Sequence, residues 1–370
     1  MVKNVRQSNF EVMRMLSMLF VVMWHLILHS GLYELLGTIK FCLEFLVLLG
    51  VVHINSFVLV TGYFQSEGKF SLKKFFKLFF LTWFYKALFV LIFYFLGLRD
   101  ISKLELFKEL MPIDSRDYWY VNCYLGLYLL SPWLNLFIRS IDQKEYRSLL
   151  LVGFILFSII PLITNQVTIS NDGYTIIHFI YMYLIGAYLK KYPIEKNYHF
   201  QYYSRCKRQV IFLGISIFCL FFNFILLQFS HSLVGSNNSL LNEMGNYLFN
   251  NNRLYSNPVV IIQSIFYFLY FSTLKIKKFK LRSISKVILD VYLIHENYYM
   301  ISYLYFLLKT RTWYQYGAEL IILMVIVGSI LIFICSLLLG YVRYFISMFI
   351  GKRKFVIKIK EKFYCYLENF

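Results

Sequence analysis

The first apolar segment of the chain reads FEVMRMLSMLFVVMWHLILHSG over residues 10–31. It is long and apolar enough to cross a bilayer as a helix, since about 20 residues span the hydrocarbon core. The segment nevertheless carries four polar side chains, Glu11, Arg14, His25 and His29. Charged groups at membrane depth are unfavourable unless they line a protein cavity or a water path. The segment therefore predicts both a membrane protein and a functional site.

These polar side chains share one helical face. Arg14 and His25 are eleven positions apart, and at 100° per residue their directions differ by only about 20°. Glu11 and His29 point to the same side, and His25 lies about 16 Å beyond Arg14 along the axis. This stripe predicts a functional site that includes His25, Arg14 and Glu11. The alternative interpretation is structural, with Arg14 bound to Glu11 and a hydrogen-bonded His25.

The composition indicates the same class of protein. Hydrophobic residues make up 59% of the 370 positions, aromatic residues 21%, and the mean hydropathy is +0.60. Such a chain is too apolar for a soluble domain, so the predicted fold class is an all-α membrane protein, a polytopic helical bundle. The net charge of +19 comes from Lys and Arg in short loops between apolar runs. Because no soluble basic domain is present, we do not expect a nucleic-acid partner.

Cysteines and the N-terminus add two further expectations. The six cysteines show neither the spacing of a disulfide framework nor that of a metal site, so no metal site is predicted. Lys3 and Arg6 precede the first apolar run, as in a signal peptide. That run is longer than a signal sequence and lacks a small-residue cleavage site, which predicts an uncleaved first span.

The apolar runs predict ten transmembrane helices. With both termini in the cytoplasm, 28 of the 38 Lys and Arg residues fall in cytoplasmic segments or at their borders, and 8 fall in outer segments. This asymmetry fits the positive-inside rule. We expect residues 1–346 to form the membrane domain and residues 347–370 a basic cytoplasmic tail. The expected spans are 10–30, 41–64, 75–98, 118–138, 149–164, 174–189, 209–229, 258–274, 287–308 and 317–346.

Further polar groups lie in the second, fourth and ninth spans. In the second span, treated as one continuous helix, Asn55 shares a face with Glu44, while His53 points the opposite way. Trp119 opens the fourth span, and a Trp at that depth commonly anchors a helix in the headgroup region. The ninth span carries His295 and Glu296, which could also simply join helices. A lone His such as His53 can bond a carbonyl instead of acting in catalysis.

Lysines in the cytoplasmic loops and near span ends have two interpretations. Lys73 and Lys74 lie in the loop before the third span and could be topology signals or could bind an anionic ligand. Lys77 and Lys86, within the third span, are expected to extend their ammonium groups toward the membrane surface.

Four motifs occur in a fixed order along the chain. They are Arg14 with His25 in the first span, NSFVLVTGYF at 55–64, YWYVNCYLGLYLLSPWLN at 118–135 and VYLIHEN at 291–297. Together they resemble the acyltransferase 3 family of integral membrane acyltransferases, over essentially the whole chain. The closest resemblance is to the short bacterial members that O-acetylate surface polysaccharides. Thr61 stands where members often have Ser before the Gly, a conservative departure.

The resemblance implies transfer of an acyl group, usually acetyl, from acyl-CoA to a hydroxyl of a surface polysaccharide or its lipid-linked precursor. It places the protein in a bacterial plasma membrane as a multi-pass enzyme. His25 matches the family's essential histidine and Arg14 its essential arginine. A histidine can act as general base or carry the acyl group itself, and both alternatives stay open. An arginine can hold a phosphate or polarise a thioester carbonyl.

The donor and acceptor are expected to meet in one cavity. Acetyl-CoA is a donor substrate and not a bound cofactor, and we expect Lys73 and Lys74 to bind its phosphates. Asn55, Trp119 and His295 or Glu296 are expected to border the cavity that holds His25. The rival function is a transporter or flippase for a lipid-linked glycan. The sequence shows no paired halves with broken helices, which many transporters have.

Overall fold

The computed structural model describes residues 8–35, 37–110, 118–164, 171–198, 200–276 and 284–351. Within these ranges every regular element is a helix, so the predicted all-α fold class is confirmed. The predicted tail lies mostly outside the described residues, and the last helix runs on to Gly351. In chain order the α-helices are α1 (Ser8–His29), α2 (Thr38–Gly50), α3 (His53–Gln65), α4 (Leu72–Phe95), α5 (Lys103–Leu110), α6 (Trp119–Ser140), α7 (Gln143–Phe154), α8 (Ile160–Thr164), α9 (Ile176–Lys191), α10 (Arg205–Leu233), α11 (Ser239–Asn251), α12 (Pro258–Thr273), α13 (Ile288–His295), α14 (Tyr298–Leu307) and α15 (Ala318–Gly351).

Seven helical stretches in the described part are long and apolar enough to cross a membrane. They are Ser8–His29, Thr38–Gln65, Leu72–Phe95, Trp119–Ser140, Gln143–Ile163, Arg205–Leu233 and Ala318–Ile350. The other three predicted spans coincide with the 16-residue helices α9 and α12 and with α13 followed by α14. The chain is thus a polytopic helical membrane protein, and the number ten stays a prediction.

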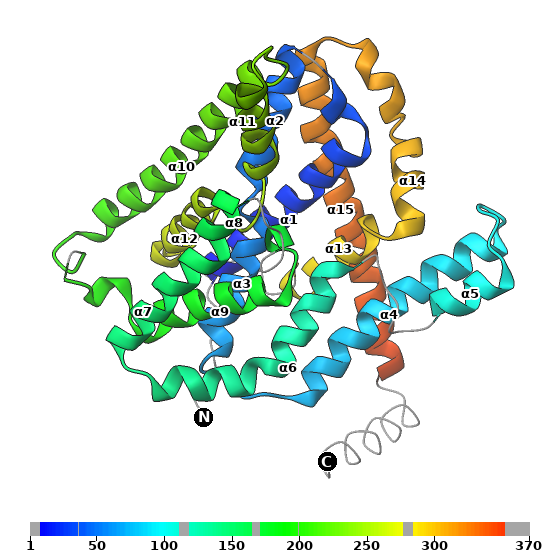
Figure 1. Cartoon of the computed structure of the whole chain (residues 1–370). Helices are drawn as coiled ribbons and strands as arrows, with labels where there is room; N and C mark the ends of the chain where they lie inside the picture. The colour runs from blue at the N-terminus through cyan, green and yellow to red at the C-terminus, as the bar shows by residue number, and fades with distance from the viewer. Residues whose placement is uncertain are drawn as a thin grey trace.

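Helices α1 and α3 lie near the centre of the bundle (Figure 1). Helices α10 and α12 cover one side of them, α13 and α15 the other, and α4 and α6 close the bundle below in this view. Helix α3 packs against α9 through two glycines. A Cβ on Gly62 would lie 2.1 Å from the Tyr183 carbonyl oxygen, and one on Gly186 would lie 2.2 Å from the Leu59 carbonyl oxygen. Only glycine permits such an approach of two backbones.

Two segments expected to be continuous helices are broken. The second span changes direction at Val51 and Val52, where α2 ends and α3 begins. The ninth span is interrupted at Glu296, and the Asn297 side chain caps α14 by accepting a hydrogen bond from the Tyr299 N–H at 3.1 Å. The expectation of unbroken helices was wrong, because an apolar run predicts that a segment crosses the membrane but not whether its helix is continuous.

A buried ion pair joins α13 to two neighbouring helices. Arg343 of α15 binds both carboxylate oxygens of Asp290, which is fully buried, and the Tyr85 hydroxyl donates to the same carboxylate at 2.6 Å. Lys86, next to Tyr85, was expected to extend toward the membrane surface. It is instead 3% exposed and lies 3.3 Å from Glu109 of α5, so that expectation was wrong. The helix α5 folds back along α4 and supplies the carboxylate that the buried ammonium requires.

Candidate active site

Two cavities of about 420 Å³ each lie along α1. The His25 cavity extends from Arg14 to His29 and is bordered by α1, α3, α6 and α13. The Lys74 cavity lies at the N-terminal end of α1, against the end of α3 and the start of α4. Four residues border both cavities: Arg14, Thr61, Leu78 and Tyr124. The arrangement forms two chambers that meet at Arg14.

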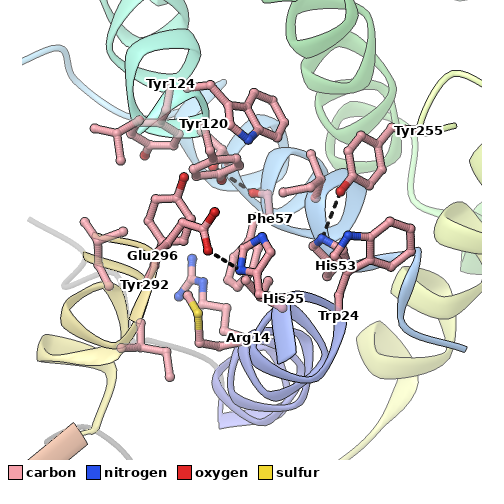
Figure 2. A pocket seen from close by; sticks show the side chains of 18 of the residues that line it. Arg14, Trp24, His25, His53, Phe57, Tyr120, Tyr124, Tyr255, Tyr292 and Glu296 are labelled. Atoms are coloured by element: carbon pink, nitrogen blue, oxygen red, sulfur yellow. Dashed lines mark hydrogen bonds and ion pairs between the residues drawn. The ribbon is translucent and has the colours of Figure 1, made fainter. Parts of the chain in front are cut away.

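His25 is held on one side by the broken ninth span. Its Nδ1 lies 2.9 Å from Glu296 Oε2 and 3.0 Å from His295 Nε2. The other carboxylate oxygen of Glu296 lies 3.5 Å from His29 Nε2. The break after α13 turns Glu296 into the cavity, and Figure 2 shows its carboxylate reaching His25 from the side opposite His53. The predicted association of His25 with His295 and Glu296 is therefore present, as direct contacts.

The hydrogen bonds assign the tautomer of His25. His295 Nδ1 faces the Val291 carbonyl oxygen, which can only accept, so His295 carries its proton on Nδ1 and offers a lone pair at Nε2. His25 Nδ1 faces that lone pair and the Glu296 carboxylate, so it must be the donor. In the neutral imidazole this leaves the lone pair on Nε2 of His25. A histidine held this way by a carboxylate is arranged to accept a proton.

Arg14 and Glu11 form an ion pair, with Nη1 of Arg14 at 2.8 Å from Oε1 of Glu11. Glu11 is 6% exposed at its side chain and Arg14 is 26% exposed. The pair accords with the structural alternative for Arg14, yet the guanidinium also borders both cavities. With five N–H donors, an arginine can bind one carboxylate and still offer donors to a ligand.

The wall opposite Glu296 contains His53, Trp24 and Tyr255. His53 was expected to face away from the site, and that expectation was wrong. His53 and Asn55 do point in opposite directions from α3, but it is the His53 face that borders the cavity, while the Asn55 face packs against α9. His53 borders the His25 cavity, with its ring 5.7 Å from that of Trp24.

Asn55 and Trp119 were both expected to border the His25 cavity, but only Trp119 does so. Trp119 borders the His25 cavity, as predicted. Asn55 does not border it. Its amide donates to the Tyr255 carbonyl oxygen at 3.0 Å and its oxygen faces His178 Nε2 at 2.8 Å. The expectation for Asn55 was wrong because periodicity separates the two polar faces of α3 without showing which of them faces α1. The amide of Asn55 instead holds the backbone of Tyr255.

Only one of the two predicted loop lysines reaches a cavity. Lys74 borders the Lys74 cavity, together with Tyr128 and Gln65. Lys73 borders neither cavity. Adjacent residues on a helix point about 100° apart, so the two lysines face different sides of α4. The first turn of α4 therefore gives one cation to this chamber.

The ligand atoms of His25, His295 and Glu296 all lie within 4.8 Å of one another, as in some metal sites. His25 Nδ1 forms a hydrogen bond with His295 Nε2 at 3.0 Å and an ion pair with Glu296 Oε2 at 2.9 Å. Donors around tetrahedral zinc lie about 3.3 Å apart, given metal–nitrogen distances near 2 Å. The geometry thus fits a hydrogen-bonded cluster better than a metal centre.

Several cavity residues were missed from the sequence. Tyr255, Tyr292 and Tyr120 border the His25 cavity. They were missed because nothing in the sequence distinguishes them from the many other aromatic residues. Tyr255 lies in a loop before α12 and has no helical periodicity that could have placed it. The contact of Tyr255 with His53 depends on tertiary packing and could not be predicted from the sequence.

The fold and this cavity define a class of protein, a membrane-embedded protein with a carboxylate-held histidine in its core. Comparison with known families gives a closer assignment. Residues 7–341 match the family described as an acyltransferase domain, the acyltransferase 3 family, and the chain belongs to it. No significant match was found among curated proteins or among solved structures. The protein is therefore a membrane acyltransferase, as its motifs predicted.

Proposed function

We propose that this acyltransferase moves an acetyl group from acetyl-CoA to a hydroxyl of a cell-surface polysaccharide or its lipid-linked precursor, in a bacterial plasma membrane. The observation that carries the proposal is the contact between His25 Nδ1 and Glu296, in a cavity that meets a second, lysine-bordered cavity at Arg14. One chamber has the groups needed for proton transfer. The other has cations suited to the phosphates of a nucleotide donor.

The donor enters through the Lys74 cavity, which the charge distribution orients toward the cytoplasm. Arg14 and Lys74 bind its diphosphate. Between phosphorus and sulfur the pantetheine arm is an amide chain of thirteen bonds, and such a chain extends roughly 15 Å. This length matches the separation of about 16 Å between Arg14 and His25 along α1. With the phosphates at Arg14, the thioester reaches His25.

This match supports the phosphate-binding role over the polarising role among the two considered for Arg14. In this arrangement the guanidinium binds phosphate, while the reacting carbonyl lies at His25. Glu11 keeps the guanidinium oriented at the junction of the cavities. Arg14 thus supplies donor binding, which should appear in the KM for acetyl-CoA.

In the transfer, His25 Nε2 takes the proton of the acceptor hydroxyl while the hydroxyl oxygen attacks the thioester carbonyl. The carbon–sulfur bond breaks, and the CoA thiolate receives the proton from the imidazolium. The products are an acetyl ester and CoA with a free thiol, so no net proton is taken up or released. Glu296 stabilises the imidazolium through Nδ1. An acetyl-imidazole on Nε2 is the covalent alternative.

The test uses radiolabelled acetyl-CoA with membrane vesicles in which the cytoplasmic face is outward. The acceptor is a glycan fraction extracted from the envelope of the source organism after deletion of the gene. The proposal expects label in the glycan only when the protein is present, and release of the label by mild alkali as expected of an ester. Label that stays in the donor, or a vesicle that moves glycan without acetylating it, would contradict the proposal.

A further inference from the structure

The wall of the His25 cavity opposite Glu296 is a binding surface that the transfer chemistry above does not use. Tyr255 and His53 are 3% and 1% exposed, and their rings lie 5.5 Å apart in an edge-to-face arrangement. The Tyr255 hydroxyl points at His53 Nε2 at 3.2 Å (Figure 2). Trp24 packs against both rings and also borders the cavity.

The direction of this hydrogen bond follows from the broken second span. His53 Nδ1 lies 2.6 Å from the carbonyl oxygen of Gly50, the last residue of α2. A carbonyl only accepts, so His53 carries its proton on Nδ1 and its Nε2 accepts. The Tyr255 hydroxyl must therefore donate to His53. Toward a ligand, the Tyr255 oxygen can only accept a hydrogen bond.

The Tyr255 oxygen has room for such a bond. A phenol oxygen has two lone pairs. The Tyr174 ring lies 5.1 Å from that of Tyr255, and even a hydrogen bond from its phenol would occupy only one of them and leave the other for a ligand. In the described part of the chain, the indole N–H groups of Trp24 and Trp119, which border the same cavity, have no hydrogen-bond partner. The wall thus offers one oriented acceptor beside two indole donors.

We propose that Tyr255, oriented by His53, accepts a hydrogen bond from a hydroxyl of the acceptor substrate and so selects which acceptor hydroxyl reaches His25. The inference rests on the proposed function. The ligand class is a compound with neighbouring hydroxyls on a ring, because the aromatic faces of Trp24 and Trp119 suit the apolar face of such a ring and their N–H groups its oxygens. His53 positions Tyr255 and does not touch the acceptor.

The central test is Tyr255→Phe in the full-length protein, purified in detergent and returned to lipid vesicles. The phenylalanine keeps the ring contacts and removes only the hydroxyl. We expect the apparent KM for the extracted envelope glycan to rise about three- to tenfold, the effect of one lost hydrogen bond. The KM for acetyl-CoA should stay within about twofold of the parent value, since the donor is held mainly by its phosphates at Arg14 and Lys74 and Tyr255 does not contact them. The matched control is Tyr267→Phe, a tyrosine of α12 that borders neither cavity and should leave both constants unchanged.

Two substitutions of His53 separate orientation from packing. Glutamine places its polar end near the position of Nε2, so His53→Gln can still accept from Tyr255. Asparagine places its polar end near Nδ1, so His53→Asn keeps the contact with Gly50 and leaves the Tyr255 hydroxyl without its acceptor. The KM for the glycan should be closer to the parent value in His53→Gln than in His53→Asn. A purely structural role of His53 would give equal effects, or effects on acetyl-CoA as well.

The outcomes distinguish this inference from the proposed function. If the parent acetylates the glycan and Tyr255→Phe has the parent KM for it, Tyr255 does not bind the acceptor and the inference is wrong, while the proposed function stands. If Tyr255→Phe changes both KM values equally, its effect is structural and the inference is again wrong. If the parent protein transfers no acetyl group to the glycan, the proposed function fails and this inference fails with it.

Discussion

His25 and Glu296 are 271 positions apart in the chain, and their side chains meet at 2.9 Å in the core of the membrane domain. The contact joins the first span to the break in the ninth. It fixes the proton of His25 on Nδ1 and leaves Nε2 for chemistry. The same contact gives the imidazolium formed during transfer a negative partner.

Replacing Glu296 by glutamine should reduce kcat on the order of 10²-fold, because the amide is uncharged and can present its NH2 to His25 and favour the wrong tautomer. The KM for acetyl-CoA should change little, since Glu296 contacts His25 and not the cations at Arg14 and Lys74 that hold the donor's phosphates. Steady-state kinetics in lipid vesicles measure both constants. The control is Glu243→Gln on α11, outside both cavities, and it should behave as the parent does. A Glu296→Gln enzyme with full kcat would show that the contact is only structural.

The two lysines at the start of α4 offer a matched pair. Lys74→Gln should raise the KM for acetyl-CoA about three- to tenfold, because an ammonium that pairs with a phosphate contributes a charge-assisted hydrogen bond. Lys73→Gln should raise it much less, since Lys73 borders neither cavity. The donor KM is measured by release of CoA thiol. Equal effects of the two substitutions would place the phosphate site outside the Lys74 cavity.

The contact of α3 with α9 should depend on its glycines. Gly62→Ala places a Cβ 2.1 Å from a backbone oxygen, so the helices must separate, and we expect a loss of several degrees in Tm or failure to fold. Gly214→Ala on α10 is the control, since a Cβ there meets nothing within 4 Å. It should be neutral or slightly stabilising, because alanine favours helix. Thermal unfolding in detergent distinguishes the two, and equal Tm values would contradict the described packing.

The predicted topology places the exposed Cys206 in a cytoplasmic segment. In intact cells or spheroplasts, a membrane-impermeant maleimide should leave Cys206 unlabelled and should label it after the membrane is opened. A variant with Ser236→Cys in the predicted outer loop should be labelled in both cases. Labelling of Cys206 from outside would overturn the orientation deduced from the charges.

Sequence periodicity located the parts of the site that lie on unbroken helix. Arg14 and His25 could be placed on one face because α1 is continuous from Ser8 to His29. The opposite directions of His53 and Asn55 could be predicted, but not which of them faces α1 and which faces α9, since both faces of α3 are buried. Whether Lys73 or Lys74 faces the Lys74 cavity depends on the rotation of α4 about its axis. That rotation could not be predicted, because α4 is apolar on nearly all sides. Tyr255 approaches His53 from a loop, and loop positions follow from tertiary packing alone.

The most direct test of the account is the acetyl-transfer rate of His25→Ala, measured with labelled acetyl-CoA and the extracted glycan at matched protein level in membranes. Removing one polar group from a spanning helix should favour membrane insertion if anything, so the variant should be present at the parent level. Losing a general base usually lowers a rate by about 10²–10⁴-fold, and losing a covalent carrier lowers it further. The expected rate is at least about 100-fold below that of the parent. A His25→Ala protein that retains more than about a tenth of the parent rate would contradict the assignment of His25 as the catalytic residue.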